Sequence, residues 1–234
     1  MIDYADYTRR TTEPLKRIVH VRRYQQVLGL VAAPLANDRV LDYGCGDGHL
    51  FSYLIKDFPR ERLVGYDPNP KLLAEASSAV SEGAALTADV EDLKRRYPFG
   101  FTLIYCVEVC EHLTDQALAE LFENLRALAA PHARIVFGVP IETGLSGFAK
   151  ALYRARKGQS GVSTSVAIQS LFGIKIERDM TDVQWFGHHT GFQHNRLRIQ
   201  LEAAGFIVRR SICLPLPVLR SIFNNEIYFL CSVG

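Results

Sequence analysis

Two carboxylates and an imidazole lie close together near the middle of the chain. They are Glu108, Glu111 and His112, in the run Glu-Val-Cys-Glu-His. Carboxylate and imidazole ligands suit Mg, Mn or Fe, and a bound cation lowers the pKa of a hydroxyl group that it holds. These three residues are therefore candidate metal ligands. The alternative is that Glu111 and His112 only stabilise a turn and the start of the next helix.

A second group of candidate residues lies in the histidine-rich and aromatic segment 185–194. A histidine beside aromatic groups can act as a general base near neutral pH. His189 is the candidate base, and His112 and Glu111 are the other candidate catalytic residues. The alternative for His189 is a capped turn in which it only packs. Trp185 and Phe186 could stack on a substrate ring or pack in the core.

A glycine-rich loop runs from Asp42 to Gly48, in the order Asp-Tyr-Gly-Cys-Gly-Asp-Gly. A dinucleotide fingerprint, Gly-x-Gly-x-x-Gly, would need a third glycine where His49 or Phe51 stands. A phosphate-binding P-loop would need Gly-Lys-Ser/Thr, which does not occur. The remaining interpretation is a ligand that has no phosphate to neutralise. Such a ligand needs a close approach of the backbone together with acidic partners.

Acidic partners follow the next two predicted strands. Asp67 follows Val64-Gly65-Tyr66, where a carboxylate can accept hydrogen bonds from both hydroxyls of a ribose. Asp89 follows the third predicted strand, where it could accept from an adenine amino group while Val90 packs on the ring. Glycine loop, first acid and second acid therefore occur in order, each directly after a strand.

On these residues the sequence resembles the Rossmann-like S-adenosylmethionine-dependent methyltransferases, nearest the branch that includes the ubiquinone-biosynthesis O-methyltransferases. The resemblance covers residues 38–140 clearly and 189–213 weakly. It implies S-adenosylmethionine as the cofactor and S-adenosylhomocysteine as the product. The residues that it implies as cofactor contacts are Asp42, Gly44, Cys45, Gly46, Asp67, Pro68, Asp89, Val90 and Cys106.

The same resemblance bears on the Glu-x-x-Glu-His motif. In the ubiquinone-pathway family a motif of this kind is associated with a divalent metal. The small-RNA 2'-O-methyltransferases use a related motif that a later histidine completes. Many metal-independent relatives carry a similar Glu-His, so a divalent metal is one of two expectations for this chain.

Strands and helices alternate along the chain, and this order must position the candidate residues. The apolar strands indicate a sheet covered on both faces by helices. We predict an α/β fold: a Rossmann-like, doubly wound sheet of about seven strands, mostly parallel with an antiparallel last strand. The predicted strands are 39–43, 63–66, 84–87, 101–107, 134–139, 206–213 and 226–232, and the predicted helices are 14–35, 49–56, 70–81, 114–130 and 195–204.

The length of 234 residues suits a single domain spanning 1–234. Within it we expect an N-terminal helical extension (1–37) and a cofactor-binding core (38–140). An irregular lid or substrate insertion (141–192) and a C-terminal helix with two strands (193–234) follow. The insertion is the segment that breaks the alternation, and long insertions of this kind usually bind ligands or close over them.

The composition excludes several classes of partner. The net charge of +2 and the absence of a basic stripe do not favour nucleic acid, and the basic cluster Lys150–Lys157 is expected to be a solvated helix face. No apolar run reaches the roughly 18 residues of a membrane span, and no secretory signal is visible, so a cytoplasmic location is expected. The five cysteines, an odd number without Cys-x-x-Cys, are expected to be free and buried.

Taken together, these features predict a methyltransferase that modifies a small molecule, most simply at a hydroxyl group. The alternatives are methylation of nitrogen, of carbon or of a glycan or lipid precursor, and RNA 2'-O-methylation through a metal-bound Glu-Glu-His site. A binding module without catalysis is a further alternative. The sequence specifies neither the acceptor nor the oligomeric state.

Overall fold

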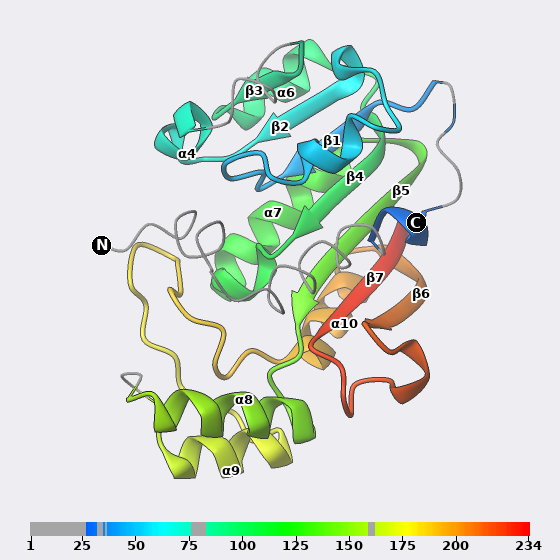
Figure 1. Ribbon diagram of the computed structural model, residues 1–234. Coiled ribbons are helices and arrows are strands. Elements are labelled where there is room, and N and C mark those ends of the chain that lie inside the picture. Colours follow the sequence, from blue (N-terminus) through cyan, green and yellow to red (C-terminus); the bar gives the residue numbers. More distant parts are fainter. Residues whose placement is uncertain (1–26, 32–34, 36, 76–82, 159–161) are drawn as a thin grey trace.

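The computed structural model describes residues 27–31, 35, 37–75, 83–158 and 162–234 (Figure 1). Most of the predicted helix 14–35 lies outside the described residues, and within them residues 27–30 are helical. The predicted helix 70–81 is described only as α4, Pro70–Glu75, and its remainder also lies outside.

A single seven-stranded sheet organises the chain, in the order β3-β2-β1-β4-β5-β7-β6 (Figure 1). Strands β1 to β5 are parallel to one another, whereas β7 is antiparallel to both of its neighbours, β5 and β6. The predicted doubly wound sheet with one antiparallel strand is thereby confirmed. The strands are β1 Val40–Tyr43, β2 Leu63–Tyr66, β3 Ala85–Thr87, β4 Phe101–Val107, β5 Ala129–Pro140, β6 Phe206–Leu214 and β7 Glu226–Val233.

The order in which successive strands are added to the sheet reverses between β1 and β4. From β1 the chain proceeds outward to β2 and β3, and then returns to β4 on the other side of β1. In an open parallel sheet, ligands bind at such a switch point, outside the carboxyl ends of the strands. The loop after β1 begins with Gly44, and the turn after β4 contains Glu111 and His112. The glycine loop and the Glu-His motif therefore start at the same edge.

Helices cover both faces of this sheet. The helices of the described residues are α3 Phe51–Leu54, α4 Pro70–Glu75, α6 Val90–Arg96, α7 Asp115–Leu128, α8 Gly144–Arg156, α9 Thr164–Phe172 and α10 His194–Ala203. Of these, α8 and α9 pack on each other at one end of the sheet rather than on its faces (Figure 1). Thr114 caps α7 as predicted, since its Oγ1 accepts from the backbone N–H of Ala117 at 3.4 Å. Helix α10 ends just before Gly205, whose φ of +87° gives the predicted left-handed stop.

The core has two parts, one on each face of the sheet. Neighbouring residues of β5 alternate between them, because successive side chains of a strand point to opposite faces. Phe137 packs with Phe122 of α7 and Phe206 of β6, whereas Val136 belongs to the cluster of Phe51 on the other face. Burial on both faces explains why the strands are almost entirely apolar.

The sequence interpretation missed two features of the fold. Helix α6 was not predicted, and Asp89 caps it by accepting from the N–H of Glu91 at 2.9 Å. The insertion 141–192, expected to be irregular, contains α8 and α9, which pack side by side (Figure 1). Gly144 and Gly147 of the insertion lie in α8, and Gly158 follows its end. Gly173 forms a left-handed end of α9, and Gly147 lets α8 pack on the backbone of Glu142.

All five cysteines are free and buried, as predicted.

Candidate active site

The glycine loop after β1 is held tightly against the neighbouring strand β2. The backbone N–H groups of Gly44 and Cys45 both donate to the carbonyl of Tyr66, at 2.7 and 2.9 Å. Gly44 and Gly46 have φ values of +83° and +53°, which side-chain-bearing residues rarely adopt. The loop is therefore a rigid cradle of backbone at the switch point.

The two glycines differ in what surrounds them. A Cβ at Gly44 would lie 2.3 Å from Cγ2 of Val109, whereas a Cβ at Gly46 would meet nothing within 4 Å. We expect Gly44→Ala to lower the free energy of unfolding by about 3 kcal/mol, from left-handed strain plus overpacking. Gly46→Ala should cost about 1 kcal/mol, from the strain alone. Urea unfolding of the two variants checks this, and equal losses would contradict it.

Asp67 is the acidic residue that closes the cradle. Its carboxylate accepts from the N–H of Gly46 and from that of Asn69, both at 2.9 Å, so it bridges the glycine loop and the start of α4. Burial raises the pKa of Asp67, and the two backbone hydrogen bonds counteract part of that rise. The carboxylate is consequently fixed in position at the carboxyl end of β2.

Asp42, on β1, lies beneath the same loop and is only 4% exposed. Burial, followed by the negative charges of Asp67 and Asp47, raises its pKa to about 8. A positive charge brought close to Asp42 would stabilise the ionised form of its carboxyl group. The loop and its two acids thus offer a place for a ligand that carries hydroxyl groups and a cation.

The other predicted cofactor residues are placed less directly. The side chain of Cys45 packs in the core near Gly65, so only its backbone belongs to the loop. Cys106 is fully buried, with its thiol 3.9 Å from that of Cys110. Pro68 and Asp89 are exposed beside the cradle, and Val90 is half-buried at the start of α6. Their contacts with a cofactor remain predictions.

The turn after β4 brings two of the candidate catalytic residues to the same edge. The 3-10 turn Cys110–His112 buries Glu111 completely and leaves His112 6% exposed. His189 arrives from the insertion, with its Nε2 3.1 Å from Nε2 of His112 and 3.9 Å from Oε1 of Glu111. Ligand atoms of these three residues all lie within 4.8 Å of one another.

Glu108 is not part of this group. Among the described residues, the one cluster with metal-ligand spacing consists of Glu111, His112 and His189. Of the predicted set Glu108, Glu111 and His112, the last two lie in this cluster, and their binding of a metal remains a prediction. Glu108 has a left-handed backbone with φ +60°, and its N–H donates to Gly138 of β5. The turn that follows places the carboxylate of Glu111, rather than that of Glu108, close to His189.

The ring of His112 is fixed on two sides by the insertion. Its Nδ1 lies 2.7 Å from the carbonyl of Phe186, and since a carbonyl only accepts, Nδ1 carries the proton. In the neutral ring, Nε2 of His112 then has a lone pair directed at Nε2 of His189. Trp185 stacks on His112, with centroids 4.5 Å apart and planes at 6°. Trp185 thus packs on the site histidine, and no separate substrate platform is needed to explain it.

Three histidines of this region are held in the neutral form. Burial is the main cause in each case, and it lowers the pKa values of His112, His189 and His194 from 6.5 to about 4. For His112 the neighbouring His189 adds to the effect. All three imidazoles are consequently uncharged at pH 7.

These shifts make the stability of the protein depend on pH. The unfolded chain takes up protons on its histidines as pH falls below 6.5, but the folded chain does so only near pH 4. The stabilisation is complete above pH 6.5 and is lost on acidification, by about 1.4 kcal/mol per pH unit and histidine. Urea midpoints measured from pH 7 to pH 4.5 check this. The slope should decrease in His194→Gln and stay unchanged in His132→Asn, a variant of an exposed histidine.

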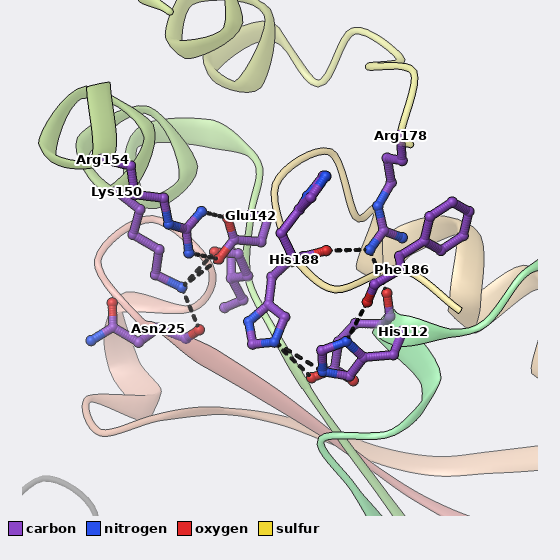
Figure 2. Close-up of polar contacts among 11 residues, drawn as sticks. His112, Glu142, Lys150, Arg154, Arg178, Phe186, His188 and Asn225 are labelled. Carbon is purple, nitrogen blue, oxygen red and sulfur yellow. Dashed lines mark hydrogen bonds and ion pairs between the residues drawn. The ribbon is translucent and has the colours of Figure 1, made fainter. Parts of the chain in front are cut away.

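Arg178 is a residue of the site that the sequence interpretation did not identify. One of its Nη atoms donates to the carbonyls of Glu111 and His188, both at 2.6 Å, and its guanidinium lies 4.1 Å from the centre of the Phe186 ring (Figure 2). Burial lowers the pKa of Arg178 to about 10, so it stays charged. It ties the turn after β4 to the histidine segment. No sequence signal distinguished it from a surface arginine.

A buried ion-pair cluster anchors the insertion beside this site. Glu142 is 2% exposed, and its carboxylate binds Arg154 at 2.5 Å and Lys150 at 3.3 Å. Burial alone would raise the pKa of Glu142, but the bond from Arg154 and the two positive charges hold it below its ordinary value. Arg154 also donates to Thr190 (3.0 Å), next to His189. The predicted solvated face Lys150–Lys157 is therefore wrong for Lys150 and Arg154 (Figure 2).

The arrangement has counterparts among solved structures. Magnesium protoporphyrin IX methyltransferase from Synechocystis PCC 6803, solved with bound S-adenosylhomocysteine, matches with a TM-score of 0.59 at 17% identity, over 97% of this chain and 92% of that one. A protein from Pyrococcus horikoshii OT3 matches with a TM-score of 0.63 at 13% identity, over 99% and 96%. The fold is therefore that of the class I S-adenosylmethionine-dependent methyltransferases.

Sequence comparison identifies the family. A model described as a methyltransferase domain matches residues 15–210, so the chain belongs to the methyltransferase domain family. Trans-aconitate 2-methyltransferase from Escherichia coli O157:H7 is 31% identical over 112 residues, which are 47% of this chain and 43% of that protein. The chain thus spans less than half the length of the curated relatives that it matches.

Proposed function

We propose that this protein transfers the methyl group of S-adenosylmethionine to a hydroxyl group of a small molecule. One observation carries the proposal: the glycine-loop cradle and the Glu111–His112–His189 cluster follow β1 and β4, which are neighbouring strands that end at the same edge. A donor bound in the cradle would present its methyl group toward the histidine cluster. The family match and the neighbour with bound S-adenosylhomocysteine support the identity of the donor.

The cradle fits the parts of S-adenosylmethionine one by one. The carboxylate of Asp67, fixed by two backbone N–H groups, retains lone pairs for the two ribose hydroxyls. The ammonium of the methionine portion would supply the positive charge that the buried Asp42 lacks. Asp89 and Val90 stand after β3, where adenine would lie.

Methyl transfer requires an acceptor in line with the sulfonium and a way to remove one proton. The acceptor oxygen forms a bond to the methyl carbon while the carbon–sulfur bond breaks, and its electron pair stays on sulfur as a thioether. The proton of the hydroxyl group passes to the neutral imidazole pair. His189, which the insertion contributes, is the proposed proton acceptor. Arg178 and Phe186 hold the pair in position and help to exclude water.

The same three residues fit a divalent cation. The two imidazole nitrogens of His112 and His189 lie 3.1 Å apart, so both could face one cation. Because their pKa values are near 4, protons hardly compete with a metal at pH 7. Glu111, His112 and His189 would hold the cation. When bound, it would lower the pKa of the acceptor hydroxyl.

The proposal leaves the identity of the methyl acceptor to experiment. The chain's membership of the ubiquinone-biosynthesis branch remains a prediction, as do nitrogen, carbon, glycan or lipid-precursor acceptors. RNA methylation would use the same metal cluster, but a net charge of only +2 argues against it. No second function is supported by a separate observation.

Two measurements test the proposed function. Titration calorimetry should show S-adenosylhomocysteine binding with a Kd in the micromolar range, and no heat at millimolar ligand would overturn the donor assignment. Methyl transfer to a panel of catechols, phenols and carboxylic acids, with and without chelator, tests the acceptor site. A rate that chelator leaves unchanged would exclude the metal and leave the imidazole pair as the base.

A further inference from the structure

The connection between β6 and β7 presents apolar side chains to solvent. Five apolar residues between positions 216 and 223 are at least 40% exposed, with Val218 at 93% and Phe223 at 63%. We call residues 216–223 the apolar tip. Its exposed members are Leu216, Val218, Leu219, Ile222 and Phe223. Contiguous exposed apolar surface of this kind marks a site of interaction.

The apolar tip is a built structure rather than a loose loop. Asn224 is fully buried at its base, where its side chain accepts from the N–H of Leu216 (2.6 Å) and donates to the carbonyls of Leu216 (2.7 Å) and Arg220. The 3-10 turn Pro217–Leu219 lies between these anchors. Since the loop is ordered in the conformation that exposes its side chains, little conformational entropy would be lost when they are buried in a partner.

Helix α8 of the insertion is joined to the base of the apolar tip. Ser146 Oγ donates to the carbonyl of Asn224 at 2.6 Å, and Lys150 Nζ donates to that of Asn225 at 3.0 Å. In Figure 1 the helix and the tip both lie at the end of the molecule away from β2 and β3. The helix pair and the segment directly after it also expose apolar residues, namely Leu145, Tyr153, Ile168, Phe172 and Ile174.

The two segments that form this end carry basic residues without acidic ones, although the exposed Glu177 and Asp179 follow directly after the first segment. Neither 143–176 nor 203–225 contains an Asp or Glu. Their basic residues are Lys150, Arg154, Arg156, Lys157, Lys175, Arg209, Arg210 and Arg220. Lys150 and Arg154 form ion pairs with the buried Glu142. The exposed basic residues are Arg156, Lys157, Lys175 and Arg220. A second copy of the chain placed on this face would bring like charges together.

We propose that this end of the molecule docks on the surface of an anionic lipid bilayer. The apolar tip would enter the boundary between headgroups and acyl chains, and the exposed basic residues would contact the headgroups, as in interfacial membrane binding generally. The attachment is superficial. No helix in the part of the chain that the structure describes is long and apolar enough to cross a bilayer.

Vesicle sedimentation with the full chain tests the proposal. The protein should partition onto phosphatidylcholine vesicles that contain phosphatidylglycerol, and much less onto phosphatidylcholine alone. Binding should weaken when salt rises from about 0.1 M to about 1 M, since the Debye length falls from about 10 to about 3 Å. Val218→Ser combined with Phe223→Ser should reduce partitioning about tenfold or more, because the inserted apolar area is lost. Arg220→Gln should reduce it about fivefold.

Phe99→Ser is the matched control, since Phe99 is 85% exposed but lies just before β4, outside both segments. It should leave partitioning unchanged. The proposal is overturned by absence of binding to the anionic vesicles at low salt, or by an equal loss in Phe99→Ser. It is also overturned if the chain is a dimer that the tip variant dissociates. If the double variant fails to unfold cooperatively on heating, Arg220→Gln and the salt dependence of the unmodified chain still decide.

Discussion

Asp67→Asn is expected to weaken the binding of S-adenosylhomocysteine by roughly 100-fold or more. The substitution keeps the size of the side chain but removes its charge and replaces one accepting oxygen by a donor. That group could no longer accept from both Gly46 and Asn69 and also receive the ribose hydroxyls. A hydrogen bond to a charged group contributes about 1.5–3 kcal/mol, so two weakened bonds account for a loss of this size.

Titration calorimetry measures this loss, and Asp57→Asn is the matched control. Asp57 is exposed after α3 and carries the same charge, so its substitution should leave the affinity within about twofold. Thermal unfolding of both variants shows whether the cradle itself has collapsed. Affinity equal to that of the unmodified chain in a folded Asp67→Asn would remove Asp67 from the cofactor site and leave the glycine loop without its main polar partner.

His189→Ala is expected to reduce kcat by about 10² to 10⁴ while leaving the affinity for S-adenosylhomocysteine unchanged. The side chain lies 3.1 Å from His112 and 3.9 Å from Glu111, in the cluster on the acceptor side. It is absent from the glycine-loop cradle. Its loss should therefore affect the proton or cation on the acceptor without disturbing the donor.

The control for this variant must respect backbone geometry. His132 is exposed on β5, but its φ of +62° disfavours alanine, so His132→Asn is the appropriate substitution. It should retain full activity. Chelator separates the two roles of His189: a metal ligand predicts that chelator reproduces the defect in the unmodified enzyme, and a base predicts that it does not. A folded His189→Ala with normal kcat would exclude both roles.

The acceptor side depends on interactions that lie outside the reacting groups. Arg178 bonds to the carbonyls of Glu111 and His188, and Phe186 accepts from His112, so the histidine pair is held by backbone atoms of two distant segments. The Glu142–Arg154 pair anchors α8 beside them. A change in the packing of the insertion would consequently change the distance between the imidazoles of His112 and His189.

Much of the fold could be predicted from local pattern. Strand β4 occupies Phe101–Val107, as its apolar run predicted, because a strand buried on both faces needs apolar residues at nearly every position. Helix α6 escaped prediction for the converse reason. Leu93 is its only buried residue, so it has no apolar period, and its start is marked instead by the Asp89 cap.

The glycine loop and Asp67 were predictable from the sequence alone. Each follows directly after a strand, and parallel neighbouring strands end at one edge, so order along the chain determines proximity in space. The acceptor side has no such rule. His189 is 77 residues from His112, and only the packing of α8, α9 and the segment tied by Arg178 decides that it, rather than Glu108, joins Glu111. Tertiary structure therefore decided the histidine cluster, because its members meet through side-chain packing rather than through strand order.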